Sequence, residues 1–123
     1  MKFGVLVHPA SITHEDLIYV LEEIKSQDVI RLWYDDHEFR DVDAVFIPSS
    51  GVYREGYREL KQAPMVRQII QFASNKGFVF GAGNGFRLLC DLGLLPGNLV
   101  ENPSGRFLGQ NCFLKVDNNN TRI

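Results

Sequence analysis

The sequence has few cysteines, no long apolar run and no large excess of either charge. Its 123 residues include only Cys90 and Cys112, too few for a disulfide-stapled scaffold. No apolar stretch reaches the roughly 20 residues that a membrane-spanning helix needs. With 13 basic and 15 acidic residues, the chain lacks the basic surplus typical of nucleic-acid binding. We therefore expect no membrane or nucleic-acid partner, and two buried thiols in a reducing cytoplasm.

Histidine is also scarce, which limits acid–base and metal chemistry. The chain has His8, His14 and His37, and no histidine after them. Their spacing does not match metal-binding patterns such as H-x-x-x-H. His14 and His37 are predicted to lie in solvent, whereas His8 follows a predicted strand and could line a cleft. We expect no metal and no other cofactor.

Strand-like and helix-like segments alternate along the chain. An apolar content of 45% and a charged content of 23% fit a single globular domain over residues 1–123. The predicted strands are Phe3–Val7, Asp28–Tyr34, Val42–Ile47, Phe78–Phe80 and Cys112–Val116. The predicted helices are His14–Ser26, Ala63–Asn75 and Asn84–Leu92, and Val52–Lys61 fits either a loop or an irregular helix. This order predicts an α/β fold of three layers with a mainly parallel sheet.

Three loops should meet at the carboxyl edge of this sheet, where α/β folds form their sites: His8–Ser11, Pro48–Tyr53 and Gly81–Gly85. The third loop lies in GFVFGAGNGFRLLCDLGLL, which predicts a strand, a tight turn and a helix. Its G-x-G-x-G spacing differs from the G-x-G-x-x-G of a dinucleotide loop. A packing turn, with a helix N-terminus that could hold an anion, is therefore favoured over a nucleotide site.

The candidate nucleophiles are weak. No residue between Gly81 and Gly85 can attack a substrate, and Cys90 lies inside a predicted helix, where we expect it in the core. Ser49 and Ser50 would need a nearby base. A new site built from His8, the two serines and Tyr53 stays a hypothesis without a visible pair of base and orienting group.

Six segments along the chain carry a family resemblance. They are MKFGVLV, IYVLEEI, DVIRLWYDD, VDAVFIP, GFVFGAGNGFRLLCDLGLLPG and LKVDNNNTRI. Together they resemble the glutamine amidotransferase subunit of phosphoribosylformylglycinamidine synthase, from purine biosynthesis. The fifth segment is the most specific, because the family typically has G-x-C-N-G-F-Q there. The resemblance implies a class I glutamine amidotransferase fold with a flavodoxin-like sheet.

The resemblance also implies a chemistry. In the family, a cysteine on the turn attacks the glutamine amide, a histidine acts as the base and a glutamate orients it. Backbone N–H groups hold the oxyanion, and the ammonia passes to a partner synthetase subunit. Here Gly83 stands at the cysteine position, followed by the family's Asn84, Gly85 and Phe86.

The other site loops depart from the family as well. Its P-G-G loop corresponds to Pro48-Ser49-Ser50, and its F-S-Y-G-D stretch, at Gly51 to Glu55, keeps only the tyrosine, Tyr53. The family's Pro-Gly-Ser-Asn loop is represented by residues 9–12. Its histidine and glutamate lie near the end of a chain almost twice as long and have no counterpart here.

The sequence therefore predicts a truncated, non-catalytic amidotransferase-like domain, a pseudoenzyme that does not hydrolyse glutamine. It would act through a homo-oligomer or a synthetase-type partner. Its cleft would be lined by Pro48, Ser49, Ser50, Gly51, Tyr53, Asn84 and Gly85. The alternatives are a glutaminase subunit of the synthase that supplies ammonia, or an engineered variant of it.

Overall fold

A parallel sheet of four strands forms the centre of the molecule, in the order β2–β1–β3–β4. The structure is a computed structural model that describes residues 1–9, 11–51 and 54–115, with the backbone alone for residues 54–56. β1 (Lys2–Val7) pairs with β2 (Asp28–Trp33) on one side and β3 (Ala44–Ile47) on the other, and β4 (Phe78–Gly81) pairs with β3. This is the start of the flavodoxin-like strand order. The predicted α/β fold is confirmed.

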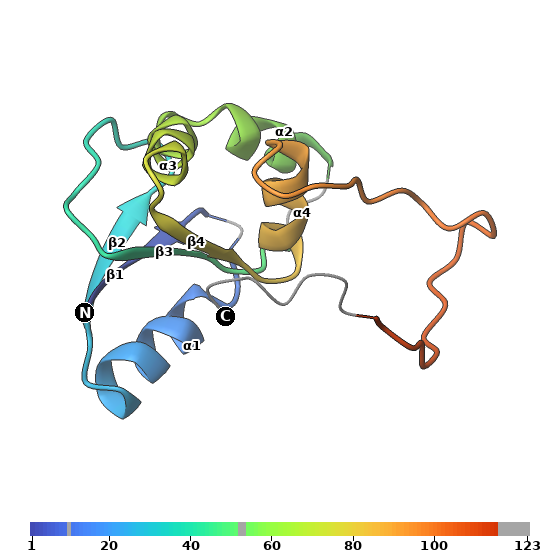
Figure 1. Cartoon of the computed structure of the whole chain (residues 1–123), viewed down its shortest axis with the longest axis horizontal. Helices are drawn as coiled ribbons and strands as arrows, with labels where there is room; N and C mark the ends of the chain where they lie inside the picture. The colour runs from blue at the N-terminus through green and yellow to red at the C-terminus, as the bar shows by residue number, and fades with distance from the viewer. Residues whose placement is uncertain (10, 52–53, 116–123) are drawn as a thin grey trace.

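Helices cover both faces of the sheet (Figure 1). On one face lies α1 (His14–Tyr19), continued by the π-helix η1 (Val20–Ile24). The other face carries α2 (Arg54–Gln62), α3 (Pro64–Ser74) and α4 (Asn84–Asp91). The result is the three-layer arrangement that the sequence predicts. None of the described helices is long and apolar enough to cross a membrane.

The central strand has a core on each side. Leu6 points into the larger core, which lies beneath α2, α3 and α4, whereas Val5 points into the smaller core beneath α1. Neighbouring residues of a strand face opposite sides of a sheet, so a strand buried on both sides needs an unbroken apolar run. This explains the FGVLV stretch. The larger core also contains Leu32, Val45, Met65, Val66, Ile69, Leu88 and Leu89.

Two helical segments differ from their predictions. The helix expected over residues 14–26 is an α-helix only as far as Tyr19 and continues as a π-helix. There the Lys25 N–H donates to the Val20 carbonyl at 3.0 Å, the i→i+5 bond typical of a π-helix. Of residues 52–61, which the sequence left open between loop and irregular helix, residues 54–61 belong to the regular helix α2, and residues 52 and 53 lie outside the described residues. In contrast, Pro64 stands at the first turn of α3 as predicted.

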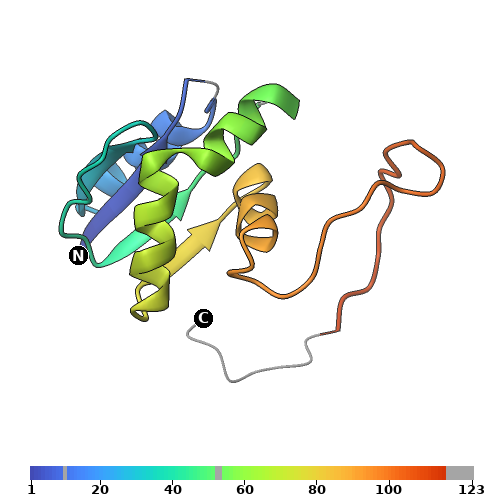
Figure 2. The same ribbon diagram turned by 90° about the horizontal axis from the view of Figure 1, so that it is seen from above.

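The segment after α4 is the main departure from the predictions. Residues 96–115 form neither helix nor strand, turn where the Gly105 N–H donates to the Asn102 carbonyl, and lie to one side of the packed body (Figures 1 and 2). The strand predicted over Cys112–Val116 is wrong for residues 112–115, and Val116 lies outside the described residues. Cys112 is exposed, so its predicted burial is also wrong, whereas Cys90 is buried as expected. Local sequence gives a segment its β-propensity, but a strand also needs a partner, and no described strand pairs with this one.

Candidate functional site

The three loops predicted to converge do meet at the carboxyl edge of the sheet. Ser11, after β1, forms an antiparallel bridge with Ser50, after β3. The Asn84 side-chain amide, after β4, donates to the Ser50 carbonyl. The parallel strands deliver all three loops to one edge, and these bonds join them there.

Two side chains at the start of α1 fasten the loops further. The Thr13 hydroxyl donates to the Ser49 carbonyl at 3.1 Å. The His14 Nδ1–H donates to the Ser11 carbonyl at 2.8 Å, and His14 Nε2 lies 3.3 Å from Glu15 Oε1. His14 is half-buried, so its prediction as a solvent-exposed histidine is wrong. His37 is exposed as predicted.

The turn from β4 into α4 has the sharp geometry of a nucleophile elbow. Gly83 precedes the first residue of α4 with φ 54° and ψ −118°. Glycine adopts such a backbone at no steric cost, whereas a residue with a side chain is strained there. In enzymes that use this turn, that strain presents the nucleophile at the tip. The chain keeps the backbone of the elbow and has no side chain at its tip.

The space above the tip is filled by Ser49. A Cβ built on Gly83 would lie 2.5 Å from Ser49 Oγ and 2.9 Å from Ser49 Cβ. Both distances are shorter than atoms tolerate, so a side chain at position 83 would displace the serine. The sequence already showed both changes. Ser49 is larger than the glycine that the resembled family has there, and Gly83 is smaller than the family's cysteine. Only the structure shows that these two changes face each other.

The other glycines of the turn allow close packing. A Cβ on Gly81 would lie 2.5 Å from the backbone of Gly85. A Cβ on Gly85 would strike the Ile47 carbonyl, at the end of β3. These two glycines therefore let α4 approach the sheet closely, and their predicted place in the turn is correct.

Three polar residues are buried in the described part of the chain, and all lie at this edge: His8, Ser11 and Ser50. The edge of the His8 ring packs against Tyr34, with centroids 4.7 Å apart. Burial lowers the pKa of His8, and the charge of Glu59 partly opposes this shift. The imidazole is thus held in its neutral form. The Ser11 hydroxyl is buried, with no hydrogen-bond partner among the described residues.

The chemistry available here is hydrogen bonding, with no thiol at the tip. Cys90 is buried inside α4, and Cys112 is exposed in the segment after α4. The described residues contain no group of three or more His, Cys, Asp or Glu side chains that could hold a metal. Of the remaining predicted positions, Pro48 is buried, Gly51 is exposed, and Tyr53 lies outside the described residues.

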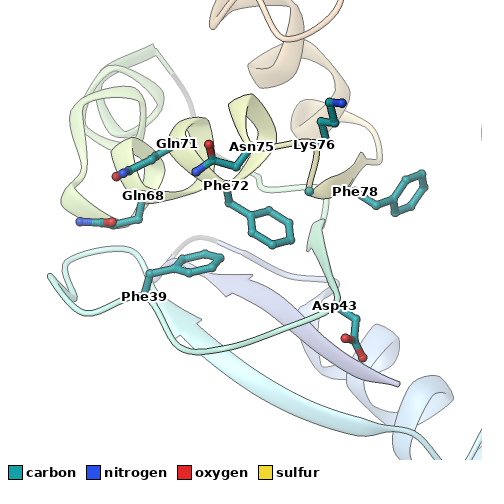
Figure 3. Close-up of a pocket in the computed structure, with 9 residues that line it drawn as sticks. Phe39, Asp43, Gln68, Gln71, Phe72, Asn75, Lys76 and Phe78 are labelled. Carbon is teal, nitrogen blue, oxygen red and sulfur yellow. The ribbon is translucent and has the colours of Figure 1, made fainter.

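Two of the cavities near the sheet lie at its opposite ends. A small apolar cavity of about 190 Å³ lies beside the elbow and is lined by Thr13, Leu17, Phe46, Ile47, Pro48, Phe80 and Ala82. A larger one of about 520 Å³ lies at the amino edge, where Asp43 precedes β3 and Gly77 precedes β4. Phe39 and Phe72 point toward each other there, with ring centroids 5.2 Å apart (Figure 3). The larger cavity is therefore separate from the loops described above.

Comparison with known proteins gives one consistent result. The phosphoribosylformylglycinamidine synthase subunits PurQ of Salinibacter ruber and Moorella thermoacetica are 35% and 39% identical to the chain over 98% of its length. PurQ of Koribacter versatilis is 33% identical over 95%. The chain spans about half the length of these relatives, 52% of each. No protein-family model matches the chain.

A solved structure agrees with these relatives. The structure of PurLQS from Thermotoga maritima superposes with a TM-score of 0.71 at 28% identity, and covers 85% of this chain and 50% of that one. The resemblance to the amidotransferase subunit of this synthase therefore extends along nearly the whole chain, in sequence and in fold. The sheet and its helices are those of a class I glutamine amidotransferase, and the chain is related to a purine-biosynthesis domain.

Proposed function

We propose that the chain is a catalytically silent glutamine amidotransferase-like domain that acts by binding another subunit. The observation that carries this proposal is the pairing of Gly83 with Ser49. A glycine supplies no nucleophile, and covalent hydrolysis of an amide needs one. The serine hydroxyl then fills the space in which a nucleophilic side chain would stand.

The rest of the elbow supports a binding role. The hydrogen bonds that join the loops are present, and the glycines that let α4 approach β3 are kept. A synthetase-type subunit fits as the partner, because the structural neighbour is PurLQS. A second copy of the chain is the alternative partner. A cytoplasmic location, expected from the unpaired thiols, is part of the same proposal.

The second candidate function is that of the relatives, as a glutaminase subunit that supplies ammonia to the synthase. The sequence identity of 33–39% favours it. It would require a nucleophile other than residue 83. Ser49 stands nearest to that position, and no described side chain forms a hydrogen bond with its hydroxyl to activate it.

Ammonia release from glutamine separates the two functions. We expect the purified chain to release no more ammonia than a protein-free blank, with or without an added PurL-type synthetase subunit. Ser49→Ala serves as the matched control and should give the same blank value. Release by the chain that disappears in Ser49→Ala would contradict the proposal and assign the serine as the nucleophile.

A further inference from the structure

The helix α1 and its continuation η1 have an outward face that is unusual for a helix in solvent. Among the described elements, they alone cover their face of the sheet (Figure 1). Their buried side chains, Ile18 and Leu21, belong to the smaller core. Residues three and four apart are neighbours on a helix surface, so the exposed positions form two adjoining rows. One row contains Asp16, Val20 and Ile24, the other contains Glu15, Tyr19 and Glu23, and all six side chains are exposed. We call these six side chains the α1 surface.

Half of the α1 surface is apolar. Tyr19 is 60% exposed, Ile24 is 59% exposed and Val20 is 39% exposed. The outward face of a surface helix normally carries charged and polar side chains, because its apolar stripe faces the core. This helix has its apolar stripe in the core and further apolar side chains on the opposite face. A single exposed apolar side chain is ordinary, but three neighbours on one helix face are typical of a binding surface.

The other half of the α1 surface is acidic. Residues 14–25 contain four acidic residues and one lysine, which gives a formal charge of −3, whereas the whole chain carries −2. Arg31 of β2 lies 3.3 Å from Glu15 and compensates that carboxylate. Asp16 and Glu23 form no ion pair within the described part of the chain. The surface therefore presents negative charge directly beside its apolar side chains.

We propose that the α1 surface binds a basic amphipathic helix of a synthetase-type subunit. Apolar side chains of that helix would pack against Tyr19 and Ile24, and its Lys or Arg side chains would face the carboxylates. A second copy of the chain is disfavoured here, because a two-fold contact would bring the same carboxylates together. This inference rests on the proposed function, since it names the surface and the chemistry through which the silent domain binds its partner.

The α1 surface adjoins the loops around the elbow. Ile12, which precedes α1, is 73% exposed and extends the surface toward the carboxyl edge of the sheet. Its two neighbours in the chain hold the site loops, since Ser11 bridges to Ser50 and the Thr13 hydroxyl donates to the Ser49 carbonyl. A helix bound along α1 would therefore border the same edge of the sheet as the elbow.

Biolayer interferometry with the 123-residue chain and a PurL-type synthetase subunit measures this contact. We expect binding that weakens as the salt concentration rises, because salt screens charges at the rim of an interface. Tyr19→Ser and Ile24→Ser should each weaken the affinity by about tenfold or more, since they remove the apolar anchors. Glu23→Lys should weaken it as well, and should reduce the salt dependence, because it reverses one of the charges that attract the partner.

Val100→Ser and Asp36→Lys are the matched controls. Val100 is 85% exposed, Asp36 is also exposed, and both lie outside the α1 surface. Each control should bind the synthetase subunit as the unmodified chain does. Every substituted side chain is exposed, so the variants should keep the fold, and their urea midpoints verify this.

Binding that Tyr19→Ser, Ile24→Ser and Glu23→Lys leave unchanged, or that the controls weaken equally, would overturn this inference and leave the proposed function standing. Absence of any binding would overturn both the inference and the proposed binding role. Light scattering on the chain alone adds a further check. A dimer that Ile24→Ser dissociates would assign the α1 surface to a second copy and contradict the proposal. Ammonia release, measured on the same samples, tests the silence of the elbow separately.

Discussion

Gly83 and Ser49 form a complementary pair at the scale of single residues. The glycine removes a side chain from the elbow, and the serine occupies the vacated space. The backbone of Gly83 keeps a positive φ that other residues adopt only under strain. The elbow therefore holds its shape without the residue that such a turn presents in an enzyme.

Gly83→Ala should expose this pairing as a loss of stability. The new Cβ would be strained by the backbone and would clash with Ser49, and we expect the free energy of unfolding to fall by about 2–4 kcal/mol. Adding Ser49→Gly removes the clash and should recover about 1 kcal/mol or more of this loss. Urea denaturation of the two single variants and the double variant measures the coupling. Strictly additive effects would show that the two residues do not compete for the same space.

His8 should make the stability of the fold sensitive to pH. Burial lowers its pKa in the folded chain, so below the ordinary value of about 6.5 the unfolded chain binds more protons than the folded one. The stability contributed by the neutral imidazole is thus present above about pH 6.5 and is lost as the pH falls toward the lower folded pKa. His8→Gln should remove this contribution to the pH dependence of the unfolding free energy. The slope should change by at most about 1.4 kcal/mol per pH unit. Urea midpoints of both chains between pH 5 and 7.5 test this, and parallel profiles would contradict it.

At the scale of elements, α2 and α4 are held together by a small polar network. The Tyr57 hydroxyl donates to Asp91 Oδ2 at 2.8 Å. The Arg87 guanidinium lies over the Tyr57 ring, 5.0 Å from its centroid, and Arg87 Nε lies 3.9 Å from Asp91 Oδ2. Burial and the bond to Asp91 raise the pKa of Tyr57 well above its usual range, so the hydroxyl stays a donor. The network orients the helix that begins at the elbow.

Tyr57→Phe should loosen this helix pair. The substitution leaves the half-buried Asp91 carboxylate without its hydroxyl donor, and we expect a loss of about 1–2 kcal/mol of unfolding free energy. The matched control is Tyr19→Phe, because Tyr19 is 60% exposed on α1 and should change the unfolding free energy very little. Equal urea midpoints for the two variants would contradict a role for the network.

The sequence predicted the buried elements better than the segments whose structure depends on a partner. β1 and α3 lie within a residue or two of their predicted bounds, because their apolar periodicity follows from the burial they undergo. Residues 52–61 were ambiguous because they are rich in charge, and of the described side chains in this segment only Leu60 is fully buried. The strand expected at Cys112 was wrong because an apolar pattern gives β-propensity but does not say whether a neighbouring strand is there to pair with. The three loops were placed correctly, but the contact of Ser49 with Gly83 depends on side-chain packing that spacing does not encode.

At the scale of the whole molecule, the fold of a glutamine amidotransferase is present, and residue 83 at the tip of its elbow carries no nucleophile. The parallel sheet delivers three loops to one edge, hydrogen bonds join them there, and glycines admit α4. Gly83 brings no side chain to the tip of the turn, and Ser49 fills the space there. Binding without chemistry is the function that we propose for this arrangement.

Covalent capture by an electrophilic analogue of glutamine, read by mass spectrometry, tests this claim most directly. The chain should carry Cys112→Ser, so that the exposed thiol outside the elbow does not react. Ser49→Gly with Gly83→Cys in the same background is the positive control, because a thiol at the start of α4 should be activated by the helix N-terminus. We predict an adduct at position 83 of the control and none on residues 47–85 of the parent chain. An adduct on Ser49 or Ser50 of the parent chain would contradict the claim that the elbow has no nucleophile.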